Sequence, residues 1–197
     1  GFDFTNYRNS PDNKCSISSD LVYKTIEDKY GNIWVATYGG GVNVVKREKD
    51  GRCLFLNRNN VMKRYPVDAY LKVRTVALDK YGRVWAGSSD GILVMSYFNN
   101  KVKIHVVADN EDELDNLQSK DVVCLACAHN GQMWVGTNGG GLSRCDDYGQ
   151  GVYVFDTFGS EDGLPSEEIK SITFDDRGNV WFATDHILCS FDVRKQI

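Results

Sequence analysis

Four tryptophans recur in the same local phrase, and this repeat constrains the fold more than any other feature of the chain. The phrase is GNIW, GRVW, GQMW or GNVW, ending at Trp34, Trp85, Trp134 and Trp181. The tryptophans follow one another at intervals of 51, 49 and 47 residues. A near-constant period of this size is typical of repeated supersecondary units, and we interpret the chain as a series of such units.

Two further columns of residues keep phase with the tryptophans. Three residues before each tryptophan stands a glycine, at Gly31, Gly82, Gly131 and Gly178. Six residues before it stands an aspartate in units one, two and four and an alanine in unit three, at Asp28, Asp79, Asp175 and Ala128. Glycine allows the positive φ of a tight hairpin, and the aspartate can accept N–H bonds across the turn. We therefore expect a hairpin before each tryptophan.

Each unit has the pattern of four short strands. In the first unit the turn signals delimit strands over Leu21–Glu27, Ile33–Tyr38, Val42–Arg47 and Arg52–Asn57. The corresponding first strand of unit three, Val122–Ala128, is apolar on both faces and is expected to be buried on both sides. Four strands per unit with a buried first strand predict an all-β fold, a β-propeller of antiparallel blades. A β-solenoid is the alternative, but its period is usually shorter.

The ends of the chain leave two interpretations of blade number. Phe2–Tyr7 resembles a lone fourth strand, and the last unit lacks one. Either this strand completes the last blade, or the chain is a fragment of a larger propeller. The absence of a leader-like segment and the abrupt ends favour the fragment, whose unpaired faces predict self-association. The predicted divisions of this single propeller region, 1–197, are an outer strand of a preceding blade in 1–20, blades at 21–68, 69–117 and 118–165, and an incomplete blade at 166–197.

The repeat resembles a known family. Its phrase D-x-x-G-x-[IMV]-W-[VAF]-[GA]-[TS]-x-x-G-G-[GLV], preceded by L-x-S-x-x-[VI], is similar to the two-component regulator propeller repeat. The segment Asp28–Val42 matches it most closely, and Gly131–Leu142 agrees equally well after its tryptophan. Unit two keeps only Asp90-Gly91 of the glycine turn, and unit four shortens the turn to Asp185-His186.

The resemblance implies a function for the chain. Such propellers form the periplasmic sensor region of hybrid two-component histidine kinases, common in Bacteroides-type bacteria, where they sense glycans and switch transcription of polysaccharide-utilisation genes. It therefore implies a non-catalytic, periplasmic chain whose parent is a histidine kinase. One alternative is a dimerisation and signal-transmission scaffold of the same receptor, and a weaker one is a stand-alone glycan-active propeller enzyme.

The candidate binding residues lie where propellers usually meet ligands, in the loops between strands four and one and between strands two and three. Aromatic, amide, carboxylate and basic groups there suit an oligosaccharide that is polyhydroxylated or acidic. The residues at these positions are Tyr38, Tyr70, Asp90, Lys120, Asn138 and His186. We interpret the four tryptophans instead as structural wedges between blades, because each occupies the same column of the repeat.

Other kinds of site find little support in the sequence. The 23 basic and 27 acidic residues give a net charge of −4, which argues against nucleic-acid binding. The longest apolar run, Val122–Ala128, is too short to span a membrane. Cys124 and Cys127 have chelating spacing, but residues three apart on a strand point to opposite faces. We therefore predict no metal, no cofactor and no catalytic residue, and interpret the acidic run Asp109–Asp115 as a solvated loop.

Overall fold

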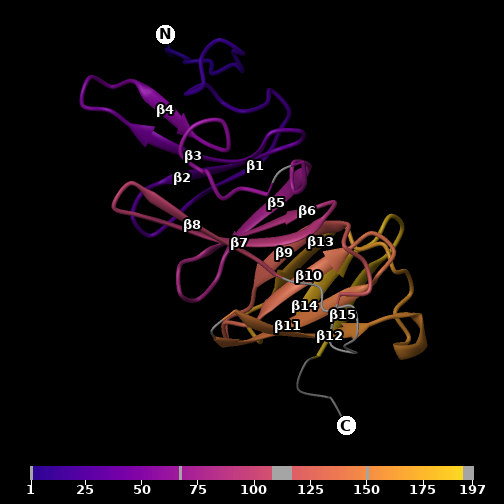
Figure 1. Ribbon diagram of the computed structural model, residues 1–197. Helices are drawn as coiled ribbons and strands as arrows, with labels where there is room; N and C mark the ends of the chain where they lie inside the picture. Colours follow the sequence, from indigo (N-terminus) through magenta and orange to yellow (C-terminus); the bar gives the residue numbers. More distant parts are fainter. Residues whose placement is uncertain (1, 67, 108–116, 150, 193–197) are drawn as a thin grey trace.

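The computed structural model describes residues 2–66, 68–107, 117–149 and 151–192, and it shows four antiparallel sheets that we call blades 1 to 4 (Figure 1). The acidic run Asp109–Asp115 lies outside the described residues. Blade 1 contains β1 (Val22–Glu27), β2 (Ile33–Thr37), β3 (Gly41–Arg47) and β4 (Cys53–Leu56). Blade 2 contains β5 (Val73–Leu78), β6 (Val84–Ser88), β7 (Gly91–Phe98) and β8 (Lys101–Val106). Blade 3 contains β9 (Val122–Cys127), β10 (Met133–Thr137), β11 (Leu142–Gly149) and β12 (Val152–Phe158).

Blade 4 contains β13 (Ser171–Phe174), β14 (Val180–Ala183) and β15 (Leu188–Phe191) within the described residues. A single 3-10 turn, η1 (Ser160–Asp162), precedes it. In every blade, strands that are consecutive in the chain are hydrogen-bonded neighbours. This is the predicted propeller blade, and the strands of blade 1 lie within one residue of the predicted bounds.

The blades follow one another in an open arc (Figure 1). The inner strands β1, β5, β9 and β13 contact each other in this order. Blades 1 and 4 lie at opposite ends of the arc (Figure 1). The described residues therefore form an open arc and not a closed four-bladed ring.

Phe2–Tyr7, predicted as an outer fourth strand, forms no strand in this structure. This segment is irregular, and Phe2 and Phe4 are exposed. The open arc places β15 at the far end of the molecule, which contradicts the interpretation in which this segment completes blade 4 (Figure 1). The segment lies instead beside β4, where the Tyr7 hydroxyl is 3.2 Å from Sγ of Cys53 and the Tyr7 ring meets Phe55 edge-on.

The core is a series of clusters between neighbouring blades, each built around one tryptophan. Trp34 packs with Val73 and Val76 of blade 2, Trp85 with residues of blade 3, and Trp134 with residues of blade 4. These three side chains are at most 1% exposed, whereas Trp181 of blade 4 is 37% exposed. The first three tryptophans are thus each buried by the blade that follows, whereas Trp181 has no following blade within the described residues.

In blades 1, 2 and 4, the hairpin before the tryptophan is held by the repeating aspartate. Oδ1 of Asp28 accepts the backbone N–H groups of Tyr30 and Asn32, at 2.9 and 3.0 Å. Its Oδ2 accepts the indole N–H of Trp34 at 2.8 Å. Gly31, with φ of 80°, closes the turn. The carboxylate therefore joins the hairpin to the buried tryptophan, a second role that the sequence pattern did not indicate.

None of the helical segments in the described residues has the length and apolar character needed to cross a membrane.

Candidate functional site

The loops between strands two and three lie on the same face of the arc as the connections from one blade to the next. We call this the loop face. The N–H groups of Gly39 and Gly41 both donate to the carbonyl of Leu71 in the next connection, at 2.8 and 2.9 Å. Those of Gly139 and Gly141 donate to the carbonyl of Glu167, both at 3.0 Å. These hydrogen bonds therefore attach each glycine turn to the connection that leads into the next blade.

The serine of the L-x-S phrase also anchors these loops, through a hydrogen bond from its hydroxyl group. Ser19 donates its hydroxyl to the carbonyl of Tyr38 at 2.9 Å, and Ser119 does the same to Asn138 at 3.0 Å. A Cβ on Gly140 would lie 2.5 Å from the backbone nitrogen of Ser119, so a side chain would force the loop away. The two loops therefore present Tyr38 and Asn138 from rigid backbone, as a binding face requires.

Tyr38 lies in a cluster of rings and cations. Its ring stacks on Tyr23 at a centroid distance of 5.5 Å and an interplanar angle of 25°. The Nζ of Lys72 and the guanidinium of Arg74 each lie 5.8 Å from its ring centre. The two cations are held at the Tyr38 ring by cation–π attraction.

Arg74 connects this cluster to blade 3. Its guanidinium forms an ion pair with Asp121, which enters β9. The other carboxylate oxygen of Asp121 accepts the side-chain amide of Asn138 at 3.1 Å. Two predicted residues, Tyr38 and Asn138, are thereby joined through a pair that the sequence analysis did not select.

The remaining predicted residues are Tyr70, Asp90, Lys120 and His186. Tyr70 is hydrogen-bonded to Asp90: its backbone N–H donates to Oδ2 of Asp90 at 3.0 Å. Lys120 precedes Asp121 in the connection to β9. His186 lies at the end of the arc, and its backbone N–H donates to Oγ1 of Thr184.

The sequence analysis missed Tyr23, Lys72, Arg74 and Asp121. A usable signal was present: Lys72, Arg74 and Asp121 all lie at the start of inner strands, on the side where the loop face is expected. Their pairing across blades could not be read from a single repeat, since Arg74 and Asp121 are 47 positions apart.

Buried ionisable groups on the inner strands do not form a nucleophilic site. Burial raises the pKa of the Cys124 thiol to about 12, which keeps it protonated and unreactive near neutral pH. Burial also lowers the pKa of Lys24 on β1. Among the described residues, no group of three or more His, Cys, Asp or Glu side chains is placed to hold a metal ion.

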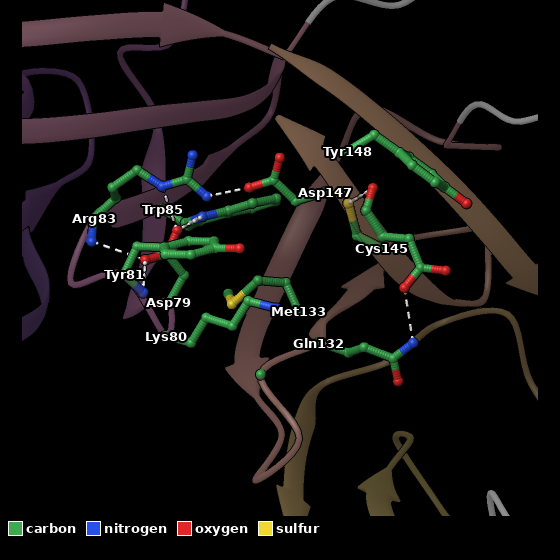
Figure 2. A pocket seen from close by; sticks show the side chains of 12 residues that line it. Asp79, Lys80, Tyr81, Arg83, Trp85, Gln132, Met133, Cys145, Asp147 and Tyr148 are labelled. Atoms are coloured by element: carbon green, nitrogen blue, oxygen red, sulfur yellow. Dashed lines mark hydrogen bonds and ion pairs between the residues drawn. The ribbon is translucent and has the colours of Figure 1, made fainter. Parts of the chain in front are cut away.

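A recess of about 230 Å³ lies between blades 2 and 3 on the opposite side, which we call the hairpin face (Figure 2). The exposed rings of Tyr81 and Tyr148 stand on its two sides, and Met133 and Cys145 line its interior. Gln132 donates to Oδ1 of Asp146 at 2.8 Å on one wall.

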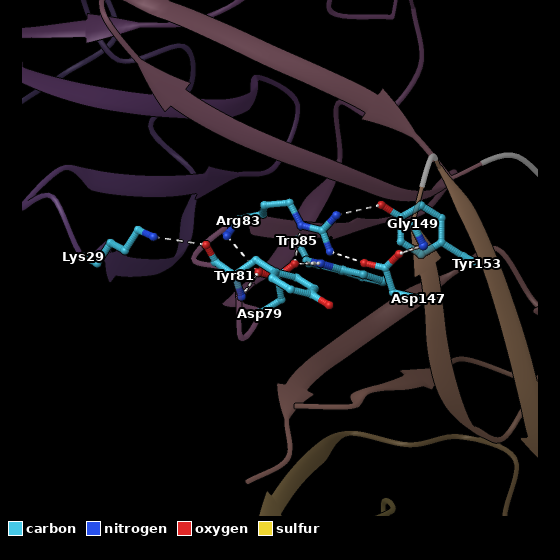
Figure 3. Close-up of polar contacts among 8 residues, drawn as sticks. All are labelled: Lys29, Asp79, Tyr81, Arg83, Trp85, Asp147, Gly149 and Tyr153. Carbon is cyan, nitrogen blue, oxygen red and sulfur yellow. Dashed lines mark hydrogen bonds and ion pairs between the residues drawn. The ribbon is translucent and has the colours of Figure 1, made fainter. Parts of the chain in front are cut away.

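Arg83 crosses the top of this recess and joins the two blades (Figure 3). Its Nε lies 2.6 Å from Oδ2 of Asp79 in its own hairpin, and its Nη2 forms an ion pair with Asp147 of blade 3. Nη1 lies 3.5 Å from the hydroxyl of Tyr153. All three guanidinium nitrogens therefore have a partner, and the arginine links blade 2 to blade 3.

Comparison with known proteins identifies the repeat. Residues 16–39, 116–139 and 163–186 match the family model described as "Two component regulator propeller". Each matched segment runs from the L-x-S phrase to the loop after the tryptophan, so the chain contains two-component regulator propeller repeats, as the motif predicted. No curated protein matches the sequence.

Solved structures share the fold over nearly the whole chain. The extracellular domain of a protein described as a hybrid two component system from B. thetaiotaomicron is 24% identical, with a TM-score of 0.70, over 92% of this chain and 23% of that one. PorZ, a surface component of the type-IX secretion system of Porphyromonas gingivalis, is 20% identical, with a TM-score of 0.67, over 88% and 26%. Virginiamycin B lyase from Staphylococcus aureus is 15% identical, with a TM-score of 0.53, over 89% and 57%.

This chain spans about a quarter of the length of the first two of these structures. The three proteins differ in role, so the common architecture by itself identifies the β-propeller fold and does not choose a function.

Proposed function

We propose that this chain, which contains two-component regulator propeller repeats, is part of the extracytoplasmic sensor region of a hybrid two-component receptor. The observation that carries the proposal is the repeat itself, matched at three places. A solved structure with the same fold is an extracellular domain described as part of such a system. The location would then be periplasmic, and the histidine kinase would belong to the parent protein. The output would be transcription of polysaccharide-utilisation genes.

Within that receptor, the loop face is the proposed recognition surface, and an oligosaccharide is its proposed ligand. The exposed ring of Tyr23, stacked on Tyr38, offers a flat apolar face, while Lys72 and Arg74 supply donors beside Tyr38. Asn138 adds an amide from the next blade. Rings flanked by several hydrogen-bonding groups on fixed backbone suit a sugar with many hydroxyl groups or an acid substituent.

We propose no catalytic role for this face. Glycoside hydrolysis needs two carboxyl groups that flank the scissile bond, one of them free to act as base or nucleophile. The carboxylate of Asp121 is engaged by both Arg74 and Asn138. That of Asp90 accepts the N–H of Tyr70 and the hydroxyl of Ser89.

A scaffold that transmits motion between receptor subunits is the second candidate, and one observation favours it. The two ends of the arc expose apolar side chains of the kind that are buried between the other blades, Leu21, Val22 and Tyr23 at one end and Trp181 at the other. Such faces pair readily with another propeller surface.

The test is ligand-dependent phosphotransfer by the full-length parent protein in membrane vesicles, with a panel of neutral and acidic di- to hexasaccharides. We expect one class of oligosaccharide to change autophosphorylation, and Tyr38→Ala to abolish that response without changing the basal rate. A parent protein without kinase and receiver segments would overturn the sensor assignment. A response that Tyr38→Ala and Arg74→Ala leave intact would favour the scaffold.

A further inference from the structure

A second surface with distinct chemistry runs along the outer rim of the arc, away from the loop-face cluster. It is a groove of about 970 Å³, lined by β7 and β8 of blade 2, by the segment after β4, and by Gly151 and Tyr153 of blade 3. We call it the rim groove. Its walls include Lys63, Arg64, Lys101, Lys103, His105 and Tyr153.

The strand β8 supplies a row of basic side chains to the rim groove. Lys101, Lys103 and His105 are exposed and alternate with Val102 and Ile104, which pack on the core between blades 1 and 2. Alternate residues of a strand point to the same side, with a repeat of about 7 Å. Ordinary strand geometry thus places three nitrogen-bearing side chains in line.

Within the described residues, and Arg83 aside, the cations of the rim groove have no acidic partner. No ion pair among the described residues includes Lys63, Arg64, Lys101 or Lys103. The described lining residues include no aspartate or glutamate. Arg83 also lines the groove, but Asp79 and Asp147 balance its charge. In a chain with a net charge of −4, this local excess of cations is the opposite of the average.

Two rings meet in the wall of the groove. His105 and Tyr153, from adjacent blades, have centroids 5.6 Å apart at an angle of 44°. The hairpin of blade 3 closes on His105 through Gly151, where a Cβ would lie 2.7 Å from the imidazole. This glycine therefore allows the hairpin to approach the imidazole ring and to form one wall of the rim groove.

We propose that the rim groove binds a glycan chain that carries sulfate or carboxylate groups, at a site separate from the loop face. The basic side chains along β8, which form no ion pair within the described part of the chain, supply the attraction for a linear polyanion. The paired rings supply a surface for the apolar face of a sugar. A groove of this kind accommodates a linear glycan better than the flat surface of a lipid bilayer.

The test compares dextran sulfate with uncharged dextran on the 197-residue chain, by calorimetric titration at several salt concentrations. We expect binding of dextran sulfate only, with an affinity that falls as salt rises. The double variant Lys101→Ser/Lys103→Ser is expected to bind about tenfold more weakly, with a salt slope smaller by roughly two. The variant Lys14→Ser/Lys49→Ser removes the same charge from exposed sites elsewhere and is expected to bind within about twofold of the parent.

Three results would overturn the proposal. An equal loss in both double variants would mean that net charge alone attracts the polymer. Equal affinity for single-stranded oligothymidylate would show a general polyanion surface. Binding to vesicles that contain phosphatidylserine, but not to dextran sulfate, would show a membrane surface. Tyr38→Ala leaves this binding unchanged in our account, so failure here is distinguishable from failure of the loop-face proposal.

Discussion

Trp34 donates its indole N–H to Oδ2 of Asp28, six residues earlier in the chain and 2.8 Å away. The same bond recurs in blade 2 at 3.0 Å and in blade 4 at 3.1 Å. Blade 3 has Ala128 at the position of the aspartate and therefore lacks the acceptor. The repeat thus contains its own comparison, three blades with this hydrogen bond and one without it.

Replacing this aspartate destabilises the fold, and adding one to blade 3 stabilises it. Asp28→Ala leaves the buried indole N–H of Trp34 and two turn amides without their acceptor, with an expected loss of about 1–3 kcal/mol in the free energy of unfolding. Ala128→Asp supplies the missing acceptor to Trp134, with an expected gain of about 0.5–1.5 kcal/mol. Urea denaturation measures both. A destabilised Ala128→Asp variant would show that blade 3 has adapted to the alanine.

The same aspartates make stability depend on pH at the acid end. Desolvation opposes ionisation of Asp28, but hydrogen bonds from Trp34, Asn32 and Tyr30 outweigh it and hold its pKa below the ordinary value. The indole of Trp181, opposed by desolvation and assisted by Asn179, lowers the pKa of Asp175 to about 2. A carboxyl group with a lowered folded-state pKa stabilises the protein above its unfolded pKa of about 3.9, and this contribution is lost as pH falls toward about 2.

We therefore expect the urea midpoint of the parent chain to fall between about pH 4 and about pH 2. The variant Asp28→Asn/Asp175→Asn keeps an acceptor at each site but removes the ionisation, and its midpoint is expected to fall less steeply over that range. Parallel curves for the two proteins would mean that other carboxyl groups cause the acid sensitivity.

The ion pair between Arg83 and Asp147 is expected to couple blades 2 and 3. Arg83→Gln introduces the residue found at the corresponding place in blade 3, Gln132. It leaves the half-buried Asp147 without its cation. A double-mutant cycle with Asp147→Asn should give a coupling free energy of about 1–2 kcal/mol. An additive cycle would show that solvent or the Tyr153 hydroxyl replaces the pair at no cost.

Much of the fold could be predicted from the sequence because its determinants are local. The strands of blade 1 were placed within one residue, since glycines and aspartates mark each turn. Phe2–Tyr7 was misplaced because its alternating pattern fits a strand but provides no partner, and the partner is set by the curvature of the whole arc. The loop-face cluster was predicted only in part. Tyr38 and Asn138 follow from the repeat, but the link through Arg74 and Asp121 depends on how two blades meet.

The exposed Trp181 predicts concentration-dependent self-association. Its ring is 37% exposed, whereas the other three tryptophans are buried by a following blade. Head-to-tail packing of a second copy would cover Trp181 with the exposed β1 side chains of that copy. We expect iodide to quench Trp181 fluorescence in dilute solution and less as concentration rises, with Trp181→Phe removing the quenchable component. Sedimentation that shows a monomer at all concentrations would contradict this expectation.

The central claim, that the loop face recognises an oligosaccharide, is tested most directly by titration calorimetry of the chain against neutral and acidic oligosaccharides. Tyr30→Ala is the matched control, because Tyr30 is an exposed tyrosine in a hairpin on the opposite face. The account predicts that at least one oligosaccharide binds, that Tyr38→Ala weakens it about tenfold or more, and that Tyr30→Ala leaves it unchanged. Absence of binding across the panel, or equal affinity in the Tyr38→Ala and Tyr30→Ala variants, would contradict it.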